Sequence, residues 1–100
     1  MTHLSPAQRA ALQRQMEIRA AVLRDEIAAD ARENLNAEPE MAALQRDRQE
    51  LRELEAALAR LQHPSFGYCV DCGDEITPLR LEANPAAKRC AACQATFEKT

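Results

Sequence analysis

Aromatic residues, glycine and long apolar runs are scarce in this sequence of 100 residues. It has no tryptophan, one tyrosine and two phenylalanines, and its apolar residues are mostly alanine and leucine, which suit a helix seam better than a wide globular core. A chain this short with so thin a core usually needs a staple such as a disulfide or a metal ion. No apolar run approaches the ~20 residues that span a bilayer, so we expect no membrane partner.

The sequence also lacks an excess of basic charge. Its net charge is -3, whereas proteins that bind nucleic acid are usually basic. Residues 1–10 contain no basic segment followed by an apolar stretch, so we expect no secretory signal. We therefore predict a cytoplasmic protein without direct sequence-specific DNA binding, in which four cysteines are better suited to hold a metal ion than to form disulfides.

A first long helix is predicted from residue 6 to about residue 33. Ser5 offers a hydroxyl N-cap, and Pro6 fits the first helical position. Apolar residues then recur every three or four positions, which is typical of one buried helix face. This stripe comprises Leu12, Met16, Ala20, Leu23, Ile27 and Ala31. The pattern breaks at residues 34–36 and restarts at Pro39, which suits the first turn of a second helix.

The second helix carries a heptad repeat. Its seam residues are Leu44, Leu51, Leu54, Leu58 and Leu61. The seam position one heptad before Leu54 is Asp47, which either pairs with an arginine or marks a frayed distal half of the arm. The helix ends near His63, because the proline that follows disfavours helical backbone in the residue before it.

These patterns predict an all-α fold. Each helix has a single apolar stripe and is not stable alone, and the short connection between them favours antiparallel pairing. We expect a helical hairpin over residues 1–62, with arms at about 6–33 and 39–62 and a tip at about 34–38, joined to a head at residues 63–100. A hairpin of this kind could serve as a dimerisation coiled coil, but attachment to a metal-clamped head favours a probe that acts as a monomer.

The head contains two C-x2-C knuckles, Cys69/Cys72 and Cys90/Cys93, separated by seventeen residues. Two such knuckles at this spacing predict one tetrahedral zinc ion held by four thiolates. Gly67 and Gly73 flank the first knuckle and supply the unusual backbone angles of a tight turn.

Between the knuckles, Ile76, Leu79 and Leu81 are expected to pack, and Pro78 and Pro85 to stiffen a loop. We expect a C-terminal helix to open near Lys88 and to run through Phe97.

Other roles for the cysteines fit less well. A disulfide framework needs export, and a redox C-x-x-C motif normally occurs singly beside a βαβ unit. A catalytic zinc keeps an open position and usually includes histidine, whereas all four ligands here are thiolates. His3 is expected at a frayed terminus, and His63 at a helix end. No phosphate loop or nucleophile motif is present, so the chain is predicted to be a non-enzyme with a structural zinc.

The head closely resembles the DksA/TraR zinc-finger family. The resemblance rests on residues 66–76 (FGYCVDCGDEI), 80–85 (RLEANP) and 90–94 (CAACQ). It implies a bacterial transcription regulator that binds RNA polymerase directly and inserts its hairpin into the secondary channel. The other possibility is a zinc-finger adaptor that uses the hairpin to dimerise or to bind another partner.

Two departures from the family concern function. Long members carry a D-x-x-D-x-A motif at the hairpin tip, and the nearest candidates here are Asp30 and Glu33. Counting back from Cys69 without a gap would instead place Glu26 and Ala29 at the motif positions, and Asp25 and Glu26 are the further carboxylate candidates near the tip. The basic positions that bind the nucleotide ppGpp in responsive members correspond to residues of other types. Those residues are Glu53, Asn84 and Gln94. The resemblance therefore implies a regulator that acts independently of ppGpp.

Overall fold

The computed structural model describes the backbone of residues 3–33 and 38–99, and the side chains of this part of the chain except those of residues 30–33 and 38–41. Four helices make up the described regular structure: α1 (Pro6–Glu33), α2 (Glu38–Arg60), α3 (Pro78–Ala83) and α4 (Ala91–Glu98). The described residues form no strand beyond one isolated bridge between Tyr68 and Glu75. The all-α prediction is confirmed.

Helix α1 begins where the sequence predicts, because Ser5 and Gln8 form a capping box around its first turn. The Gln8 backbone N–H donates to Ser5 Oγ at 3.0 Å, and the Ser5 N–H donates to Gln8 Oε1 at 2.8 Å. Two backbone donors that the helix itself cannot satisfy are thereby paired. Pro6 follows at the first helical position, where a missing N–H has no consequence.

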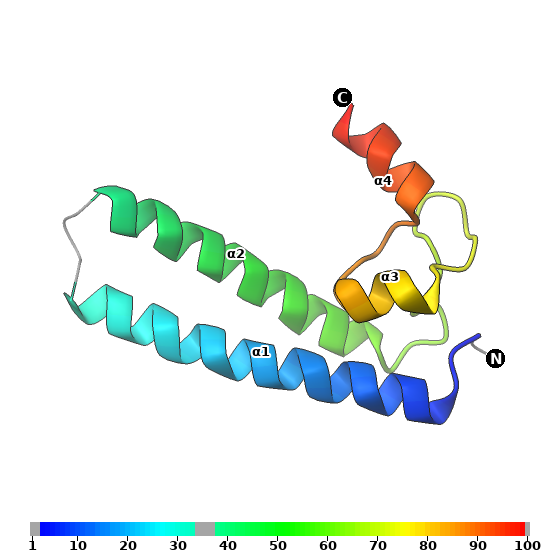
Figure 1. The fold of residues 1–100 in the computed structure, drawn as a ribbon, viewed down its shortest axis with the longest axis horizontal. Coiled ribbons are helices and arrows are strands. Elements are labelled where there is room, and N and C mark those ends of the chain that lie inside the picture. The colour runs from blue at the N-terminus through cyan, green and yellow to red at the C-terminus, as the bar shows by residue number, and fades with distance from the viewer. Residues whose placement is uncertain (1–2, 34–37, 100) are drawn as a thin grey trace.

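Helices α1 and α2 run antiparallel and form the hairpin, drawn as the long blue and green ribbons of Figure 1. The described members of both predicted stripes lie on the inner faces, with Met16 and Leu23 completely buried. Arg19 donates to Glu50 at 2.8 Å and Arg24 donates to Glu55 at 3.1 Å, so one ion pair lies on each flank of the seam. Exposed pairs of this kind contribute at most about 1 kcal/mol each, so the apolar seam dominates.

The half-buried Asp47 lies close enough to Arg19 to contribute to the raised pKa of that guanidinium, whose main cause is the hydrogen bond to Glu50. Asp47 therefore sits beside the Arg19–Glu50 pair on the flank of the seam. Among the described residues, no helix combines the length and apolarity needed to cross a membrane.

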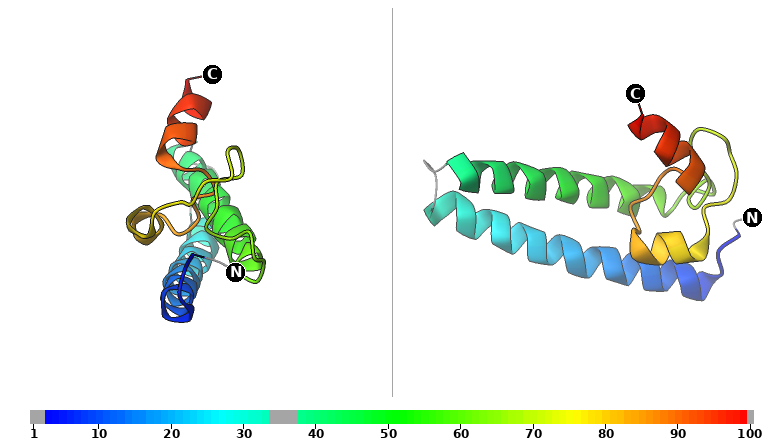
Figure 2. Two further views of the ribbon diagram at one scale, coloured as in Figure 1. Left: turned by 90° about the vertical axis from the view of Figure 1, so that its right-hand side faces the viewer. Right: turned by 45° about the horizontal axis from the view of Figure 1, so that its top comes forward.

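One hydrophobic core joins the base of the hairpin to the head. Its buried members are Leu4, Leu12, Met16, Leu23, Leu54, Ala57, Leu61, Phe66, Cys69, Ile76, Leu81 and Ala87. The hairpin and the head, predicted to divide between residues 62 and 63, therefore share one hydrophobic core. Figure 2 shows α3, which contributes Leu81 to this core, beside the hairpin, whereas α4 points away from the hairpin.

The head differs from the sequence prediction at three points. Pro78 does not stiffen a loop but begins α3, with Thr77 Oγ1 accepting from the Arg80 N–H as the N-cap. Ile76 and Leu81 are buried as predicted, whereas Leu79 is 78% exposed because it lies on the outer face of this short helix. The C-terminal helix begins at residue 91, three residues later than expected.

Candidate metal centre

The four cysteines meet at one point of the head. Their sulfur atoms all lie within 4.8 Å of one another, and Cys72 Sγ is 3.8 Å from Cys90 Sγ. A zinc ion with four Zn–S bonds of about 2.3 Å places tetrahedral sulfurs about 3.8 Å apart. The same distance is far longer than a disulfide bond of about 2.05 Å, and all four cysteines are free thiols. The cluster holds a single structural zinc ion, and its four thiolates leave no open coordination position.

The first knuckle is a tight loop closed by backbone hydrogen bonds. The Cys69 N–H donates to Asp74 O at 2.7 Å, and the Gly73 N–H returns to Cys69 O at 3.0 Å. Gly73 has a φ of +79°, which glycine adopts without steric cost. At the base of the loop, the Ile76 N–H donates to Gly67 O at 2.8 Å. This ladder turns both thiol groups of the loop toward one metal ion.

The second knuckle is built into the start of α4. Cys90 is the N-cap of this helix, and its sulfur accepts a hydrogen bond from the Cys93 N–H at 3.4 Å. The N-terminus of a helix carries partial positive charge, which stabilises thiolates placed there. The start of α4 thus orients the second pair of ligands.

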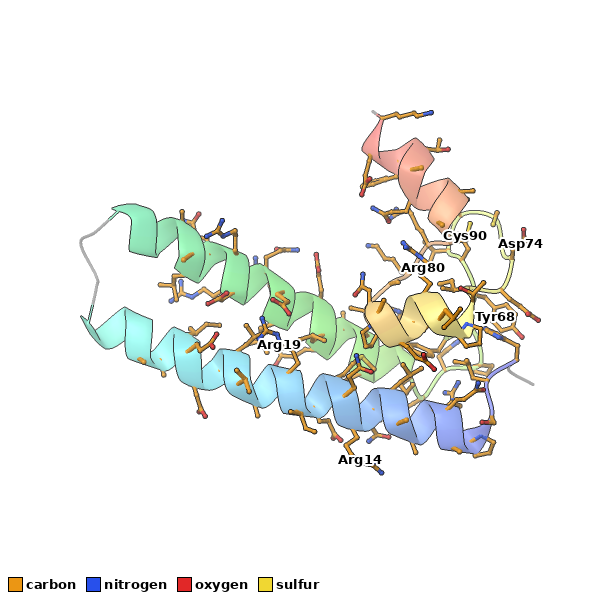
Figure 3. All side chains as sticks on the ribbon, in the orientation of Figure 1. Arg14, Arg19, Tyr68, Asp74, Arg80 and Cys90 are labelled. Atoms are coloured by element: carbon orange, nitrogen blue, oxygen red, sulfur yellow. The ribbon has the colours of Figure 1, made fainter. Side chains whose placement is uncertain are left out.

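A network around Arg89 fixes the two knuckles relative to each other. The Arg89 Nε donates to Asp71 Oδ2 at 2.7 Å, and the guanidinium carbon lies 4.0 Å from the centre of the Phe97 ring. Arg80 Nε donates to the Arg89 carbonyl at 3.0 Å, and the Val70 N–H donates to Lys88 O at 2.9 Å. These contacts join the loop, the second knuckle and α4 in addition to the four sulfur ligands. Figure 3 shows Arg80 and Cys90 in this part of the head.

The thiols have unequal proton affinities. Burial raises the pKa of Cys69, but backbone hydrogen bonds from Cys72, Cys90 and Asp71 outweigh this effect and lower its pKa to about 6. Hydrogen bonds from the neighbouring sulfurs of Cys90, Cys72 and Cys69 raise the pKa of Cys93. The metal-free cluster therefore retains protons, and zinc binding displaces them because the metal requires thiolates.

Comparison with known proteins identifies the head. Residues 64–99 match the profile of the prokaryotic dksA/traR C4-type zinc finger. Residues 64–99 form a DksA/TraR zinc finger. The chain is also 43% identical over 53 residues to the RNA polymerase-binding transcription factor DksA of Haemophilus influenzae, and 40% identical over 53 residues to that of Escherichia coli K12. The matched stretch is 53% of this chain but only 37% and 35% of those two proteins.

Solved structures extend the likeness of the DksA/TraR finger to the hairpin. Transcription factor DksA2 from Pseudomonas aeruginosa superposes with a TM-score of 0.83 over 97% of this chain and 88% of its own, at 21% identity. The RNA polymerase binding protein and transcriptional regulator Dks from Chlamydia trachomatis gives a TM-score of 0.64 over 96% of this chain and 93% of its own, at 25% identity. The hairpin and the DksA/TraR finger therefore share their arrangement with these proteins.

The candidate residues of the hairpin tip lie far from the DksA/TraR finger. Asp30 and Glu33 belong to the last turns of α1, and their side chains lie outside the described residues. Of the tip predicted at about residues 34–38, residues 34–37 also lie outside them, whereas Glu38 begins α2. Asp25 and Glu26 are exposed on α1. The two candidate pairs occupy successive turns at the distal end of the hairpin.

The three positions compared with the family's ppGpp-binding residues meet in one cavity of 520 Å³ between α2, α3 and α4. Its lining includes Glu53, Asn84 and Gln94, together with the basic residues Arg60, Arg80, Lys88 and Arg89. Three of these cations are already engaged. Arg80 and Arg89 belong to the network that joins the knuckles, and Arg60 Nη2 donates to Ala86 O at 3.4 Å. Burial lowers the pKa of Arg60.

Sequence reasoning missed the environment of His3. It was expected at a frayed terminus, which is wrong: His3 Nε2 lies 2.8 Å from Gly67 O, and its ring packs edge-on against Tyr68 with centroids 5.2 Å apart. The available signal in the sequence was Gly67, two residues before the ligand Cys69. A Cβ at this position would lie only 2.9 Å from His3 Nε2, so glycine leaves room for the His3 ring.

Substituting Gly67 by alanine is expected to lower the free energy of unfolding of the zinc-loaded protein. Left-handed backbone strain alone costs a non-glycine residue about 1–2 kcal/mol, and the loss is expected to be larger than this. Gly67 has a φ of +93°, and the new Cβ would meet both His3 and Leu4. Chemical denaturation followed by circular dichroism measures the loss. Gly73→Ala is the matched control, because its φ of +79° imposes similar strain with no atom within 4 Å of the added Cβ. Equal losses in the two variants would show that the N-terminal contact contributes nothing.

Proposed function

We propose that this protein is a non-enzymatic transcription regulator that binds RNA polymerase directly, as a monomer in the cytoplasm, and inserts its hairpin into the secondary channel. The observation that carries the proposal is the union of a DksA/TraR finger with an antiparallel hairpin of 28- and 23-residue arms. Relatives that share this finger are named for binding RNA polymerase.

The division of labour within the molecule supports insertion of the hairpin. The finger and the hairpin share one core at the base of the hairpin, and the last turns of α1 contain the carboxylate residues Asp30 and Glu33. Placed near the catalytic Mg²⁺ of a polymerase, such carboxylates would change the local charge around the metal or the mobile elements beside it. Open complexes at promoters would change in stability as a result.

We further propose that regulation does not require ppGpp. A nucleotide with several phosphates needs unpaired cations, and the compared positions supply a carboxylate and two neutral amides, from Glu53, Asn84 and Gln94. Arg80 and Arg89 direct guanidinium groups to protein acceptors. Among the basic residues of the cavity lining, this leaves the Lys88 side chain to bind phosphate. A single lysine would bind a highly charged nucleotide only weakly.

Binding to core RNA polymerase in the absence of DNA is the expected result of a direct test. Zinc-loaded protein should be retained by immobilised polymerase and displaced by other secondary-channel factors. Metal-free protein is the control, because its head should not present the same surface. Tighter binding to isolated duplex DNA, with the steep salt dependence of phosphate contacts, would contradict the proposal.

One observation favours the adaptor alternative. Ile18 and Val22 are 61% and 41% exposed one turn apart on α1, where a second copy could cover them. A chain that sediments as a dimer and fails to bind polymerase would support this alternative over the channel proposal.

A further inference from the structure

The N-terminal residues of the chain pack on the first zinc knuckle. His3 and Leu4 precede α1, and His3 reaches Gly67, 64 positions further along the chain, at the start of the loop that carries Cys69 and Cys72. The His3 side chain is only 10% exposed, and Leu4 is 3% exposed within the same core cluster as Cys69. Figure 3 shows Tyr68, which the His3 ring contacts, beside the N-terminal segment.

The His3 hydrogen bond falls on the carbonyl that closes the knuckle. Gly67 O accepts from the Ile76 backbone N–H at 2.8 Å, and this bond joins the two ends of the loop that contains both ligands. His3 Nε2 lies 2.8 Å from the same oxygen. Since a carbonyl oxygen only accepts, Nε2 must carry the proton and donate. Both acceptor sites of the closing carbonyl are therefore used.

The ring is held on its other sides as well. Its edge-on contact with Tyr68 has an interplanar angle of 74°, and its Nδ1 lies 3.8 Å from the Glu75 carboxylate. Tyr68 and Glu75 are the two residues paired in the isolated bridge at the base of the loop. His3 thus contacts both edges of the loop closure: Gly67 and Tyr68 on one side, Glu75 on the other.

We propose that His3 is a positioning residue of the zinc site, and that residues 3 and 4 form a clasp which holds the first knuckle closed and slows zinc release. A thiolate of a closed four-ligand site can leave the metal only when its loop opens. The rate of release therefore follows the free energy of that local opening. A hydrogen bond and a buried ring at the loop closure raise this free energy without touching the metal. The clasp does not depend on binding to polymerase.

The test compares two substitutions of His3 in the zinc-loaded full chain. His3→Ala is expected to release zinc roughly fivefold faster to a saturating chromogenic chelator, which corresponds to the loss of about 1 kcal/mol from the closed loop. His3→Gln is expected to restore most of the slow release, because its side-chain amide can donate to Gly67 O in place of Nε2.

Gln8→Ala is the matched control, because it removes a contact of similar strength from the capping box of α1 but leaves the knuckle untouched. Its zinc release is expected to match the wild-type rate. The proposal is overturned if His3→Ala releases zinc at the wild-type rate, or if His3→Gln is as fast as His3→Ala. It is also overturned if Gln8→Ala accelerates release as much as His3→Ala, since fraying of α1 would then be the cause.

Discussion

Substituting Cys69 or Cys93 by serine is expected to abolish tight zinc binding and to unfold the head. A structural zinc site contributes about 10–16 kcal/mol to folding, which is as large as the whole stability of a typical small protein. Cys69 also belongs to the core shared with α1 and α2. The hairpin should therefore lose order together with the head.

Zinc content per chain, measured by mass spectrometry, and helix content, measured by circular dichroism, test this expectation. Val70→Ser is the control, because Val70 lies in the same knuckle, is 57% exposed and contributes no sulfur. It should keep one zinc per chain. Full metal content in either cysteine variant, or a disulfide in fresh protein, would refute the assignment of the four ligands.

Neutralising the distal carboxylates is expected to remove most of the effect on transcription while leaving polymerase binding nearly intact. For Asp30→Asn combined with Glu33→Gln, we expect affinity within about tenfold of wild type, or ~1.4 kcal/mol. The shaft and head supply most of the contact area, whereas a few charges at the tip can act on the catalytic centre. Both positions lie in the last turns of α1, where carboxylates face the unfavourable end of the helix dipole.

Transcription in vitro and a parallel binding assay separate the two effects. Glu17→Gln removes an exposed carboxylate from the shaft of the same helix and serves as the control. Unchanged regulation by the double variant would exclude Asp30 and Glu33 from the mechanism. Asp25 and Glu26, exposed on the preceding turn, would then be the next pair to neutralise.

The features that sequence predicted well are those with local causes. The Ser5-Pro6 helix start follows from capping chemistry within one turn, and the heptad of leucines in α2 follows from helical periodicity. The metal cluster follows from the spacing of two knuckles, because each brings its own pair of sulfurs together. The helix start, the heptad and the pairing of sulfurs within each knuckle need no contacts distant in the chain.

The sequence predictions that were wrong concern a helix too short to show a pattern and a contact between residues distant in the chain. Helix α3 has only six residues, too few to show a periodic pattern, so Pro78 was interpreted as part of a loop although it occupies the first turn of the helix. The exposure of Leu79 follows from the orientation of that helix. The docking of His3 on Gly67 joins residues 64 positions apart, and no local pattern reports such a contact.

The shared core lies near the base of the hairpin, so a small rotation at the base produces a large displacement of the distal end. In α1 the core cluster extends only from Leu12 to Leu23, and the remaining turns to Glu33 project beyond it. At 1.5 Å per residue, the end of α1 lies about 32 Å from the first of these contacts. A tilt of about 5° at the base would displace the end of the helix by about 3 Å, which is the length of a hydrogen bond. A substitution in the head could therefore misplace the distal carboxylates without altering any residue near them.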